Sequence, residues 1–485
     1  MEKRPARVIL VNPPHSLEER YGSMKAVGNT MPSLGLLGLA GFLRGRGFTV
    51  GLIDSPARGL SFDATVREAL AFSPDIAGLA AYTPSVHNAA RTAGMLKEAR
   101  PTLPVILGGP HVSAVPALTL SMFPDFDAAA VGESEGHLES LIRTILDGGS
   151  LSGIPGTAFR RDGEVVVTAR APELRDLDSL PFPAWDLLPG FPAAYRPAAH
   201  TYRRLPSATM FTSRGCPEHC AFCDRSVFGN RVRAFSAEYV VDQMEVLVRR
   251  FGIRDLTIYD DIFPLLKPRL IRICEMMRSR GLNLTWSCNS RVNFADRRTL
   301  KVMKEAGCYQ IGYGIESGDQ AILDRITKGF RLEEAEEAIR MTDEAGIKAK
   351  GFFITGHPGE TLATIRKTVD FAKRLALSDY QTCFFTPYPG TADPKALEKE
   401  GKVEVDWPLM NLLQPAFIPA GLSRSDLVYW AARSYREFYL RPRIIWRYVS
   451  NIRRPEHLVQ IARGARALAQ SVARSWLVRL PGRGG

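Results

Sequence analysis

The stretch SRGCPEHCAFCDRS (213–226) crowds three cysteines, Cys216, Cys220 and Cys223, into one loop at spacings of four and three residues. Thiolates select zinc or iron–sulfur clusters. Structural zinc takes four ligands, usually as two separated pairs, but the other four cysteines stand alone and His219 is badly placed to complete the site. A three-cysteine loop instead suits a four-iron–four-sulfur cluster with one unligated iron, and such an open position is where a substrate or cosubstrate binds.

The cysteine loop follows the first of six predicted strand–helix repeats, which occupy residues 205–400. Short apolar strands alternate there with amphipathic helical patterns such as 237–251 and 332–346, which indicates a parallel sheet covered by helices. Six repeats predict a partial (β/α)6 barrel of the TIM type, whose functional side chains gather at the carboxyl ends of the strands. The predicted strands are 208–213, 255–261, 284–290, 309–317, 348–356 and 380–387.

Residues 1–150 show the same alternation and predict a doubly wound parallel sheet with helices on both faces. Proline, glycine and small polar residues follow these strands. In open sheets of this kind, ligands bind in the crevice outside the carboxyl ends of the strands, and glycine lets the backbone approach a bulky ligand. Ordinary strand–helix turns are the alternative explanation. The predicted strands are 6–14, 48–54, 75–83, 104–110 and 127–133, and the segments at their ends are NPP (12–14), YTP (82–84), GGPH (108–111) and GES (132–134).

Two further segments complete the predicted organisation. Residues 151–204 form a proline-rich linker with a hairpin, which we expect to lie over a surface because its large apolar side chains need burial. Residues 401–485 are predicted to be helical and basic. The last 45 residues hold ten arginines and one acid, Glu456, so most of the chain's net charge of +12 lies there. A helix over 458–480 would either pack on its own protein or dock on an anionic membrane or a large apolar substrate.

The composition is that of a soluble globular protein, with 45% hydrophobic and 24% charged residues. No apolar run is long enough to span a bilayer, and VILV (8–11) is too short for a signal peptide. Seven cysteines, three of them crowded together, do not resemble a disulfide framework. We therefore expect a cytoplasmic protein with at most peripheral membrane contact through its basic end. Since the excess charge is confined to that end, we expect no nucleic-acid partner.

The spacing CxxxCxxC, with the aromatic Phe222 before the last cysteine, resembles the signature of radical S-adenosylmethionine enzymes. The preceding Arg214-Gly215 and the six repeats fit the same family. The resemblance implies that the three cysteines hold the cluster and that S-adenosylmethionine chelates the fourth iron. One electron from the reduced cluster then breaks a carbon–sulfur bond, which gives methionine and a 5′-deoxyadenosyl radical that abstracts hydrogen from the substrate. An external donor of the flavodoxin or ferredoxin type would supply the electron.

The resemblance also implies contacts to S-adenosylmethionine at the ends of later strands. Asp260 and Asp261 sit where the family contacts the amino group, although a Gly-Glu pair is usual there. Arg291 could pair with the methionine carboxylate, and Glu316 could accept from the ribose hydroxyls. Gly356, in GHPGE (356–360), resembles the glycine of the loop near the adenine. The alternative for each charged residue is an ordinary ion pair.

The N-terminal sheet resembles the cobalamin-binding, Rossmann-like domain often found before this radical module. The runs that carry the match are LGLLGLAGFLRGRGFTVGLID (34–54), GGPHVS (108–113) and VGESEG (131–136). No Asp-x-His motif is present to supply a histidine to cobalt, which fits either radical enzymes that lack this ligand or a degenerate domain that binds no cobalamin. The implied cobalamin contacts are Asn12, Pro13, Thr83, Gly108, Gly109, Pro110, His111 and Glu133.

Together these resemblances imply a cobalamin-dependent radical enzyme that methylates an unactivated carbon of a small-molecule or lipid-like substrate through methylcobalamin. One alternative is a non-methylating enzyme similar to the anaerobic porphyrin-ring cyclase or to lipid-modifying relatives, which the basic and aromatic end of the chain favours. The other is a cobalamin-binding regulatory protein with a structural cluster, against which the open iron position argues.

Overall fold

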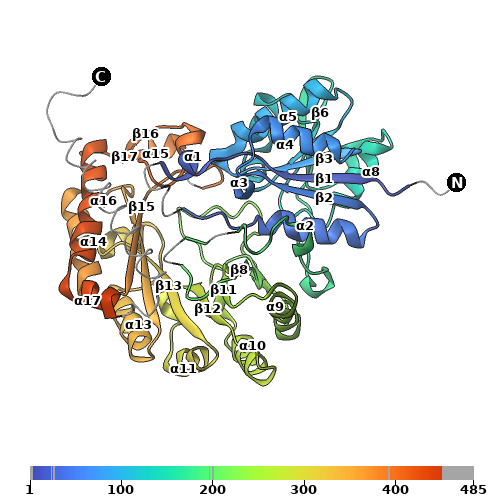
Figure 1. The fold of residues 1–485 in the computed structure, drawn as a ribbon. Coiled ribbons are helices and arrows are strands. Elements are labelled where there is room, and N and C mark those ends of the chain that lie inside the picture. Colours follow the sequence, from blue (N-terminus) through green and yellow to red (C-terminus); the bar gives the residue numbers. More distant parts are fainter. Residues whose placement is uncertain are drawn as a thin grey trace.

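The computed structural model describes residues 4–22, 25, 28–195, 197–198, 201–391 and 394–450. Two parallel sheets lie side by side, and the strands of the N-terminal sheet run toward the barrel, so that their carboxyl ends face it (Figure 1). The predicted fold class is therefore confirmed: a parallel N-terminal sheet, a partial barrel and a helical C-terminal region. The helix expected over 458–480 lies outside the described residues.

The N-terminal sheet has the strand order β2-β1-β3-β4-β5-β6-β7. The first five strands are parallel, and β6 and β7 form an antiparallel hairpin that pairs with β5. The hairpin of the predicted linker thus extends the N-terminal sheet. The strands are β1 (Arg7–Asn12), β2 (Thr49–Asp54), β3 (Ile76–Ala80), β4 (Val105–Gly108), β5 (Ala128–Ala130), β6 (Thr157–Arg161) and β7 (Glu164–Val167).

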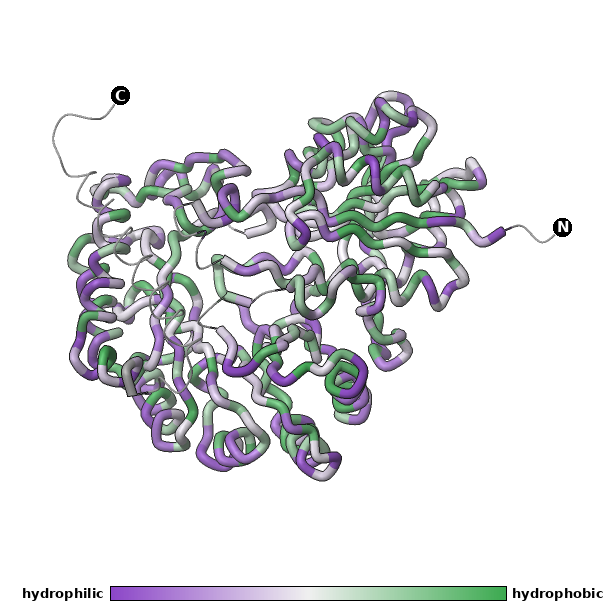
Figure 2. Tube along the Cα trace, viewed as in Figure 1, coloured by the Kyte–Doolittle hydropathy of each residue, from purple (hydrophilic) through white to green (hydrophobic). Residues whose placement is uncertain are grey.

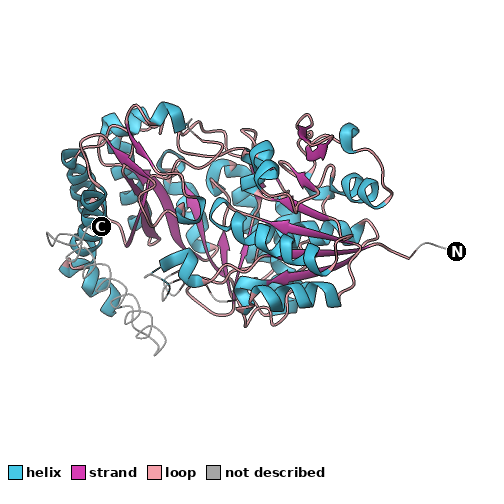
Figure 3. Cartoon of the chain, turned by 90° about the horizontal axis from the view of Figure 1, so that it is seen from above, coloured by secondary structure: helices cyan, strands magenta, loops and turns pink. Residues whose placement is uncertain are grey.

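Helices cover both faces of this sheet (Figure 3). Because side chains alternate along a strand, Val8 and Leu10 of β1 pack beneath α2 and α8, whereas Ile9 and Val11 pack beneath α4 and α5. Burial on both sides explains the continuous apolar run VILV, which appears as a hydrophobic layer in Figure 2. The helices are α1 (Leu17–Tyr21), α2 (Leu34–Gly45), α3 (Ser55–Arg58), α4 (Phe62–Ala71), η2 (Thr83–Ser85), α5 (Val86–Ala99), α6 (Pro110–Ala114), α7 (Pro116–Met122), α8 (Leu138–Leu146) and η3 (Leu151–Gly153).

The proline-rich linker packs against the N-terminal domain as predicted. Its short helices η4 (Leu177–Ser179) and η5 (Trp185–Leu187) join the same apolar core as α2, and Trp185 is buried. The Phe182 carbonyl lies so close to Gly41 of α2 that any Cβ at this position would overlap it. Glycine is therefore required where the linker crosses the helix.

The second sheet has the order β15-β14-β13-β12-β11-β8, and all six strands are parallel. A short antiparallel pair, β9 (Ser213–Arg214) and β10 (Arg233–Ala234), closes the cysteine loop at the end of the first strand. The strands are β8 (Ser207–Met210), β11 (Asp255–Ile258), β12 (Thr285–Ser290), β13 (Cys308–Glu316), β14 (Lys348–Thr355) and β15 (Asp379–Phe384). The helices are α9 (Ala237–Phe251), η6 (Phe263–Leu265), α10 (Lys267–Ser279), η7 (Val292–Phe294), α11 (Arg297–Glu305), α12 (Gln320–Arg325), α13 (Leu332–Glu344) and α14 (Leu362–Arg374).

The C-terminal region closes the open edge of the barrel. The hydroxyl of Tyr435 on α16 accepts a hydrogen bond from the Thr382 N–H at 3.2 Å and donates one to the Thr382 carbonyl at 3.0 Å, and Tyr439 bonds Tyr380 of β15 in the same way. An edge strand that would otherwise expose its backbone is thereby covered. The elements are α15 (Pro394–Leu397), β16 (Gly401–Val403), η8 (Trp407–Leu409), β17 (Phe417–Pro419), α16 (Arg424–Tyr439) and α17 (Pro442–Ser450).

The same region also reaches the N-terminal domain. Trp407 of η8 packs edge-on against His111, with ring centroids 4.4 Å apart, and lies 6.4 Å from the ring of Phe123. This contact joins the segment that follows the barrel to α6, the short helix after β4. No helix of the described segments is both long and apolar enough to cross a membrane.

Candidate active site at the facing strand ends

The cysteine loop runs from β9 to β10 and carries three thiols of different exposure. Cys220 is buried, Cys216 is half-buried and Cys223 is exposed. Desolvation by the surrounding protein raises the pKa of Cys216 and Cys223, and negative charge on Asp261 and Cys220 contributes to both increases, which bring the pKa of Cys223 to about 11. The three sulfurs and the Asp261 carboxylate therefore share one electrostatic environment. A bound cation would reverse this effect and favour the thiolates.

The side chains of the cysteine loop do not converge as they would around a single metal ion. Among the described residues, no three His, Cys, Asp or Glu side chains form a group suited to hold one ion. An iron–sulfur cluster does not need such convergence because each thiolate binds a different iron atom. The donor set of three thiolates on one loop fits a four-iron–four-sulfur cluster.

Asp260 holds the start of the cysteine loop in place. Its side chain is 1% exposed, accepts a hydrogen bond from the Thr212 N–H at 2.5 Å and another from the Ser213 hydroxyl at 2.7 Å. Arg269 adds a bond to the Thr212 carbonyl at 2.6 Å. The structure places this carboxylate in an enclosed position with Thr212 and Ser213 as its partners, and the predicted contact between Asp260 and S-adenosylmethionine stays a prediction. Its neighbour Asp261 is exposed and is the acid that approaches the thiols.

Arg291, which follows β12, contacts the cysteine loop. Its Nη1 lies 3.4 Å from Cys220 Sγ and 2.9 Å from Glu218 Oε2, and its Nη2 donates to the Lys328 carbonyl. Both terminal nitrogens are thus engaged by protein, and the buried Nε has no partner among the described residues. In the structure Nη1 binds the cysteine loop and Nη2 binds the Lys328 carbonyl, and the predicted fork onto the methionine carboxylate stays a prediction.

Glu316 ends β13 in a strained conformation. Its φ is +69°, which non-glycine residues adopt rarely and mostly at functional sites. The Oε1 atom accepts from Lys328 Nζ at 2.8 Å, and a Cβ on Gly314 would lie 2.5 Å from this oxygen. Lys328 Nζ in turn lies 5.5 Å from the ring centroid of Phe222 in the cysteine loop. Glu316, a predicted site residue, therefore lies beside the cysteine loop. No feature of the sequence indicated Lys328 as its partner.

The GHPGE loop (356–360) places a buried side chain, that of His357, next to Phe222. Gly356 has a φ of +90°, as a left-handed turn requires. The fully buried ring of His357 lies 6.0 Å from Phe222 and 5.7 Å from Phe385, and neither ring nitrogen has a partner among the described residues. Burial, followed by the charge of Lys328, lowers the pKa of His357 to about 3, so the ring is neutral. The GHPGE motif was identified in the sequence for Gly356, and no role was predicted for His357.

The N-terminal strand ends surround an apolar cavity of about 130 Å³. It lies between the sheet and the helices α2 and α8, and its lining includes Tyr82 and three of the predicted contacts, Gly108, Gly109 and Pro110. Gly109 has a φ of +106°, and a Cβ there would come within 2.6 Å of the Ala81 carbonyl. Only glycine lets the chain turn at this rim.

The other predicted contacts on these loops do not line the cavity. Pro13, Thr83 and His111 are buried, and the His111 Nδ1 lies 3.1 Å from the Thr83 hydroxyl while its ring packs on Trp407. Burial lowers the pKa of His111 to about 4. Asn12 donates to Asp54 at 2.8 Å. Packing or a side-chain partner holds each of these four residues away from the cavity, and their predicted cobalamin contacts stay predictions.

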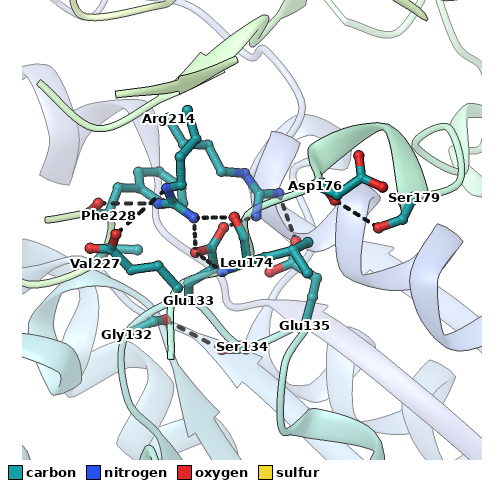
Figure 4. A network of polar contacts seen from close by, with 12 residues as sticks. Gly132, Glu133, Ser134, Glu135, Leu174, Asp176, Ser179, Arg214, Val227 and Phe228 are labelled. Atoms are coloured by element: carbon teal, nitrogen blue, oxygen red, sulfur yellow. Dashed lines mark hydrogen bonds and ion pairs between the residues drawn. The ribbon is translucent and has the colours of Figure 1, made fainter. Parts of the chain in front are cut away.

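Glu133 joins the N-terminal domain to the cysteine loop (Figure 4). One carboxylate oxygen accepts from Arg214 Nη1 and the other from Arg233 Nη1, and Glu135 binds Arg214 Nη2 at 2.7 Å. The side chains of Glu133 and Arg233 are 4% and 8% exposed. Glu133 was predicted to contact cobalamin, but both oxygens are taken by arginines that flank the cysteine loop. In the structure Glu133 is a buried link between the domains, and its contact with cobalamin stays a prediction.

Comparisons with known proteins agree with this architecture. Residues 210–372 match the Radical SAM superfamily and residues 23–142 match the B12 binding domain. An uncharacterized methyltransferase of Pyrococcus horikoshii is 33% identical over 443 residues, which span 90% of this chain and 94% of that protein. The chain belongs to the cobalamin-binding radical S-adenosylmethionine enzymes. Membership confirms the predicted family and the three predicted cofactors: a four-iron–four-sulfur cluster, S-adenosylmethionine and cobalamin.

Two other comparisons describe the range of this enzyme family. An anaerobic magnesium-protoporphyrin IX monomethyl ester cyclase of Rubrivivax gelatinosus is 29% identical over 442 residues, which cover 90% of this chain and 77% of the cyclase. The structure of the cobalamin-dependent S-adenosylmethionine radical enzyme OxsB, with aqua-cobalamin and S-adenosylmethionine bound, superimposes with a TM-score of 0.74 over 97% of this chain and 72% of that chain, at 18% identity. At that identity the structure supports the fold alone.

Three exposed aromatic side chains of this radical enzyme follow strands of the two sheets. Tyr82 is 58% exposed after β3, and Phe211 and Tyr259 are each 39% exposed after β8 and β11. Desolvation nevertheless raises the pKa of Tyr82 and Tyr259, and Tyr21 of the N-terminal domain raises that of Tyr259 further. Tyr82 and Tyr259 therefore lie beside other protein atoms despite their exposure. Of the three aromatics, only Tyr82 lies in a predicted strand-end segment, YTP (82–84); nothing in the sequence marked the other two, because an aromatic at a strand end usually belongs to the core.

The buried Glu360 makes the stability of this enzyme pH-dependent. It is 1% exposed, and burial raises its pKa from 4.5 to about 8 even though the N–H groups of Gly356 and His357 bind its Oε2. The folded protein therefore keeps a proton that the unfolded chain releases. The contribution of Glu360 to stability is thus fully present below pH 4.5 and falls as the pH rises toward 8, by at most about 1.4 kcal/mol per pH unit. Urea unfolding of wild type and Glu360→Gln at several pH values should show this slope only in the wild type. The exposed Glu333→Gln variant should keep the wild-type slope, and a Glu360→Gln protein that also kept it would contradict the assignment.

Proposed function

We propose that this enzyme transfers a methyl group to an unactivated carbon of a substrate held between the cysteine loop and the N-terminal strand ends. The observation that carries the proposal is the relative of 33% identity over nearly the full length of both chains, which is named a methyltransferase. The buried Glu133–Arg214 pair supports it, since it fixes the cobalamin-binding domain against the cluster loop. Two cofactors that act on one carbon need such fixed proximity.

We assign the cluster to Cys216, Cys220 and Cys223. When bound, the cluster supplies the electron that cleaves S-adenosylmethionine, and cobalamin carries the methyl group. The exposed Asp261 carboxylate is placed to accept from a cationic amino group beside the thiols. Glu316 keeps Oε1 on Lys328 and offers its second oxygen to hydroxyl groups. The turn at Gly356 and the neutral, buried His357 give Phe222 an uncharged neighbour, while Lys328 supplies a positive charge near the same ring.

Cobalamin binding is assigned to the apolar cavity under α2 and α8 and to its glycine rim at Gly108 and Gly109. The lining is almost entirely aliphatic, which suits a flat apolar part of a large ligand. Tyr82 is part of the lining of this cavity, although its side chain is 58% exposed. We place residues 1–150 and the following hairpin in the cobalamin-binding unit, because β6 and β7 complete its sheet.

The test of this function uses two products that need no knowledge of the substrate. Reconstituted enzyme is incubated without oxygen with dithionite, cobalamin and S-adenosylmethionine. We expect 5′-deoxyadenosine from the radical step and S-adenosylhomocysteine that depends on cobalamin. Absence of both products would refute a radical enzyme. Formation of 5′-deoxyadenosine alone would favour the cyclase-like alternative, which the 29% identical cyclase supports.

The surface of α17 supports a finer proposal about the substrate or its location. Trp446 and Ile445 of α17 are 71% and 46% exposed, and Arg443 lies on the same helix. Leu440, the C-cap of α16, is 58% exposed. Apolar side chains beside arginines suit the surface of an anionic membrane. We propose that a cytoplasmic enzyme meets a lipid-like or large apolar substrate through this end of the chain.

A further inference from the structure

A basic depression lies on the outside of the cysteine loop. It has a volume of about 490 Å³ and is widely open to solvent. Three of its lining residues are arginines: Arg170 from the linker, and Arg225 and Arg231 from the second half of the loop. The rest of the lining consists of Ala171, Glu173, Gly229 and Asn230.

The walls of the depression are continuous with the segment that carries the cluster ligands. Arg225 follows Cys223 by two residues, so their Cα atoms are at most about 7.6 Å apart. On the other wall, the Arg231 carbonyl lies so close to Gly215, the residue before Cys216, that no Cβ would fit between them. The φ of Gly215 is +81°, which also favours glycine. A molecule seated in the depression would therefore lie next to the cluster loop.

The positive charge of this surface is not neutralised. Arg170 donates to the Val227 carbonyl at 3.2 Å and Arg225 to the Glu218 carbonyl at 3.0 Å, and neither bond brings a negative charge. Within the described part of the chain, no carboxylate forms an ion pair with Arg170, Arg225 or Arg231. Nearby acids have partners of their own.

Glu218 is 2.9 Å from Arg291, Glu173 is 3.8 Å from Arg233, and Asp224 accepts from the Ser226 hydroxyl at 2.8 Å. The lining of the depression therefore holds three arginines and one acid, Glu173, which Arg233 shares, so the lining carries a net positive charge. Asp224 beside it keeps its negative charge, because a hydroxyl donor does not neutralise a carboxylate. Such a surface attracts and orients an acidic partner.

We propose that this depression docks an acidic one-electron carrier protein, which delivers the electron that the cluster needs. The proposal rests on the radical function argued above. One electron leaves the reduced carrier and enters the oxidised cluster, so the carrier is oxidised by one electron, the cluster is reduced by one, and no atom is transferred. Encounters between redox proteins use small interfaces, often below about 1,200 Å². A shallow basic surface beside the cluster loop fits that kind of transient contact better than a closed ligand pocket does.

The test uses the full chain with its cluster and an acidic flavodoxin. The variant is Arg170→Glu/Arg231→Glu, which spares Arg225 and its bond inside the loop. Calorimetry should show wild-type binding that weakens as salt is raised, and at least about tenfold weaker binding by the variant. The matched control, Arg67→Glu/Arg298→Glu, makes the same change of net charge on exposed residues of α4 and α11 and should bind like the wild type.

A second measurement separates failure of this proposal from failure of the function. With dithionite, which needs no docking site, variant and wild type should form 5′-deoxyadenosine at equal rates and show the same cluster absorption. With reduced flavodoxin, the variant should be at least about tenfold slower. Equal flavodoxin affinity and equal flavodoxin-driven rates in variant and wild type would overturn the docking site while the function stands. Binding of inorganic phosphate without binding of flavodoxin would overturn it too, and absence of 5′-deoxyadenosine with dithionite would instead refute the radical function.

Discussion

Cys220→Ala is expected to abolish the cluster and, with it, all radical chemistry. Cys220 is the most buried of the three loop thiols, and Arg291 approaches its sulfur at 3.4 Å. With two thiolates left on the loop, the iron content should fall from about four atoms per chain to less than about one, and the brown absorption should disappear. Formation of 5′-deoxyadenosine should then be undetectable, because the electron has no route to S-adenosylmethionine.

The control for this experiment is Cys383→Ala. Cys383 is a lone thiol on β15 whose nearest polar partner is the Phe353 carbonyl at 3.7 Å, and we assign it no chemistry. That variant should retain full iron content and absorption. Iron content and absorption that survive in Cys220→Ala, or in the matching Cys216→Ala and Cys223→Ala variants, would refute the ligand assignment. Circular dichroism of the metal-free proteins would show whether the fold is intact in each.

The parts of this molecule that could be predicted are those whose signals are local. Each parallel strand is buried on both faces, so it appears in the sequence as a short apolar run between helical patterns. The run RVILVN became β1 and TIYDD marked the end of β11. The cysteine spacing is also local, since three ligands on one loop need no information from the rest of the chain. Fold class and cluster loop therefore followed from short stretches.

The choice between adjacent side chains could not be predicted in this way. Asp260 and Asp261 are chemically identical, but at the end of a strand successive side chains point in opposite directions. The structure turns Asp260 inward to Thr212 and leaves Asp261 exposed near the thiols. Arg291 was expected to bind a ligand carboxylate, yet the acid it meets is Glu218 of the loop itself. Which carboxylate an arginine binds is decided by tertiary packing.

Long-range contacts were the other limit. Lys328 approaches Glu316 only because a short helix returns the chain to the end of β13, and no motif marks that lysine. Glu133 and Arg214 are 81 residues apart in different domains. The motif around Glu133 was recognised, but its place in a ligand-binding domain suggested a ligand contact. The structure gives it protein partners instead.

Glu133→Ala should therefore lower the free energy of unfolding by about 3–5 kcal/mol, the usual effect of leaving buried charges unpaired. Arg233 would lose its closest acid and Arg214 one of its two. Urea unfolding of the full chain measures the change. Glu139→Ala serves as the control in the same domain, because Glu139 and its partner Arg143 are 31% and 54% exposed and such pairs contribute about 1 kcal/mol or less.

A double-mutant cycle shows whether the loss comes from the arginines or from a missing ligand contact. In the Arg233→Met background, one of the two charges that Glu133 neutralises is already gone, so Glu133→Ala should be milder there by about 1–3 kcal/mol. Equal losses of unfolding free energy in both backgrounds, together with weaker cobalamin binding by Glu133→Ala, would support the predicted contact between Glu133 and cobalamin. Coupling of the expected size would mean that the same carboxylate stabilises the domain interface and holds the strand from which the cysteine loop begins. Glu133→Ala should then also slow incorporation of the cluster, since Arg214 lies two residues before Cys216.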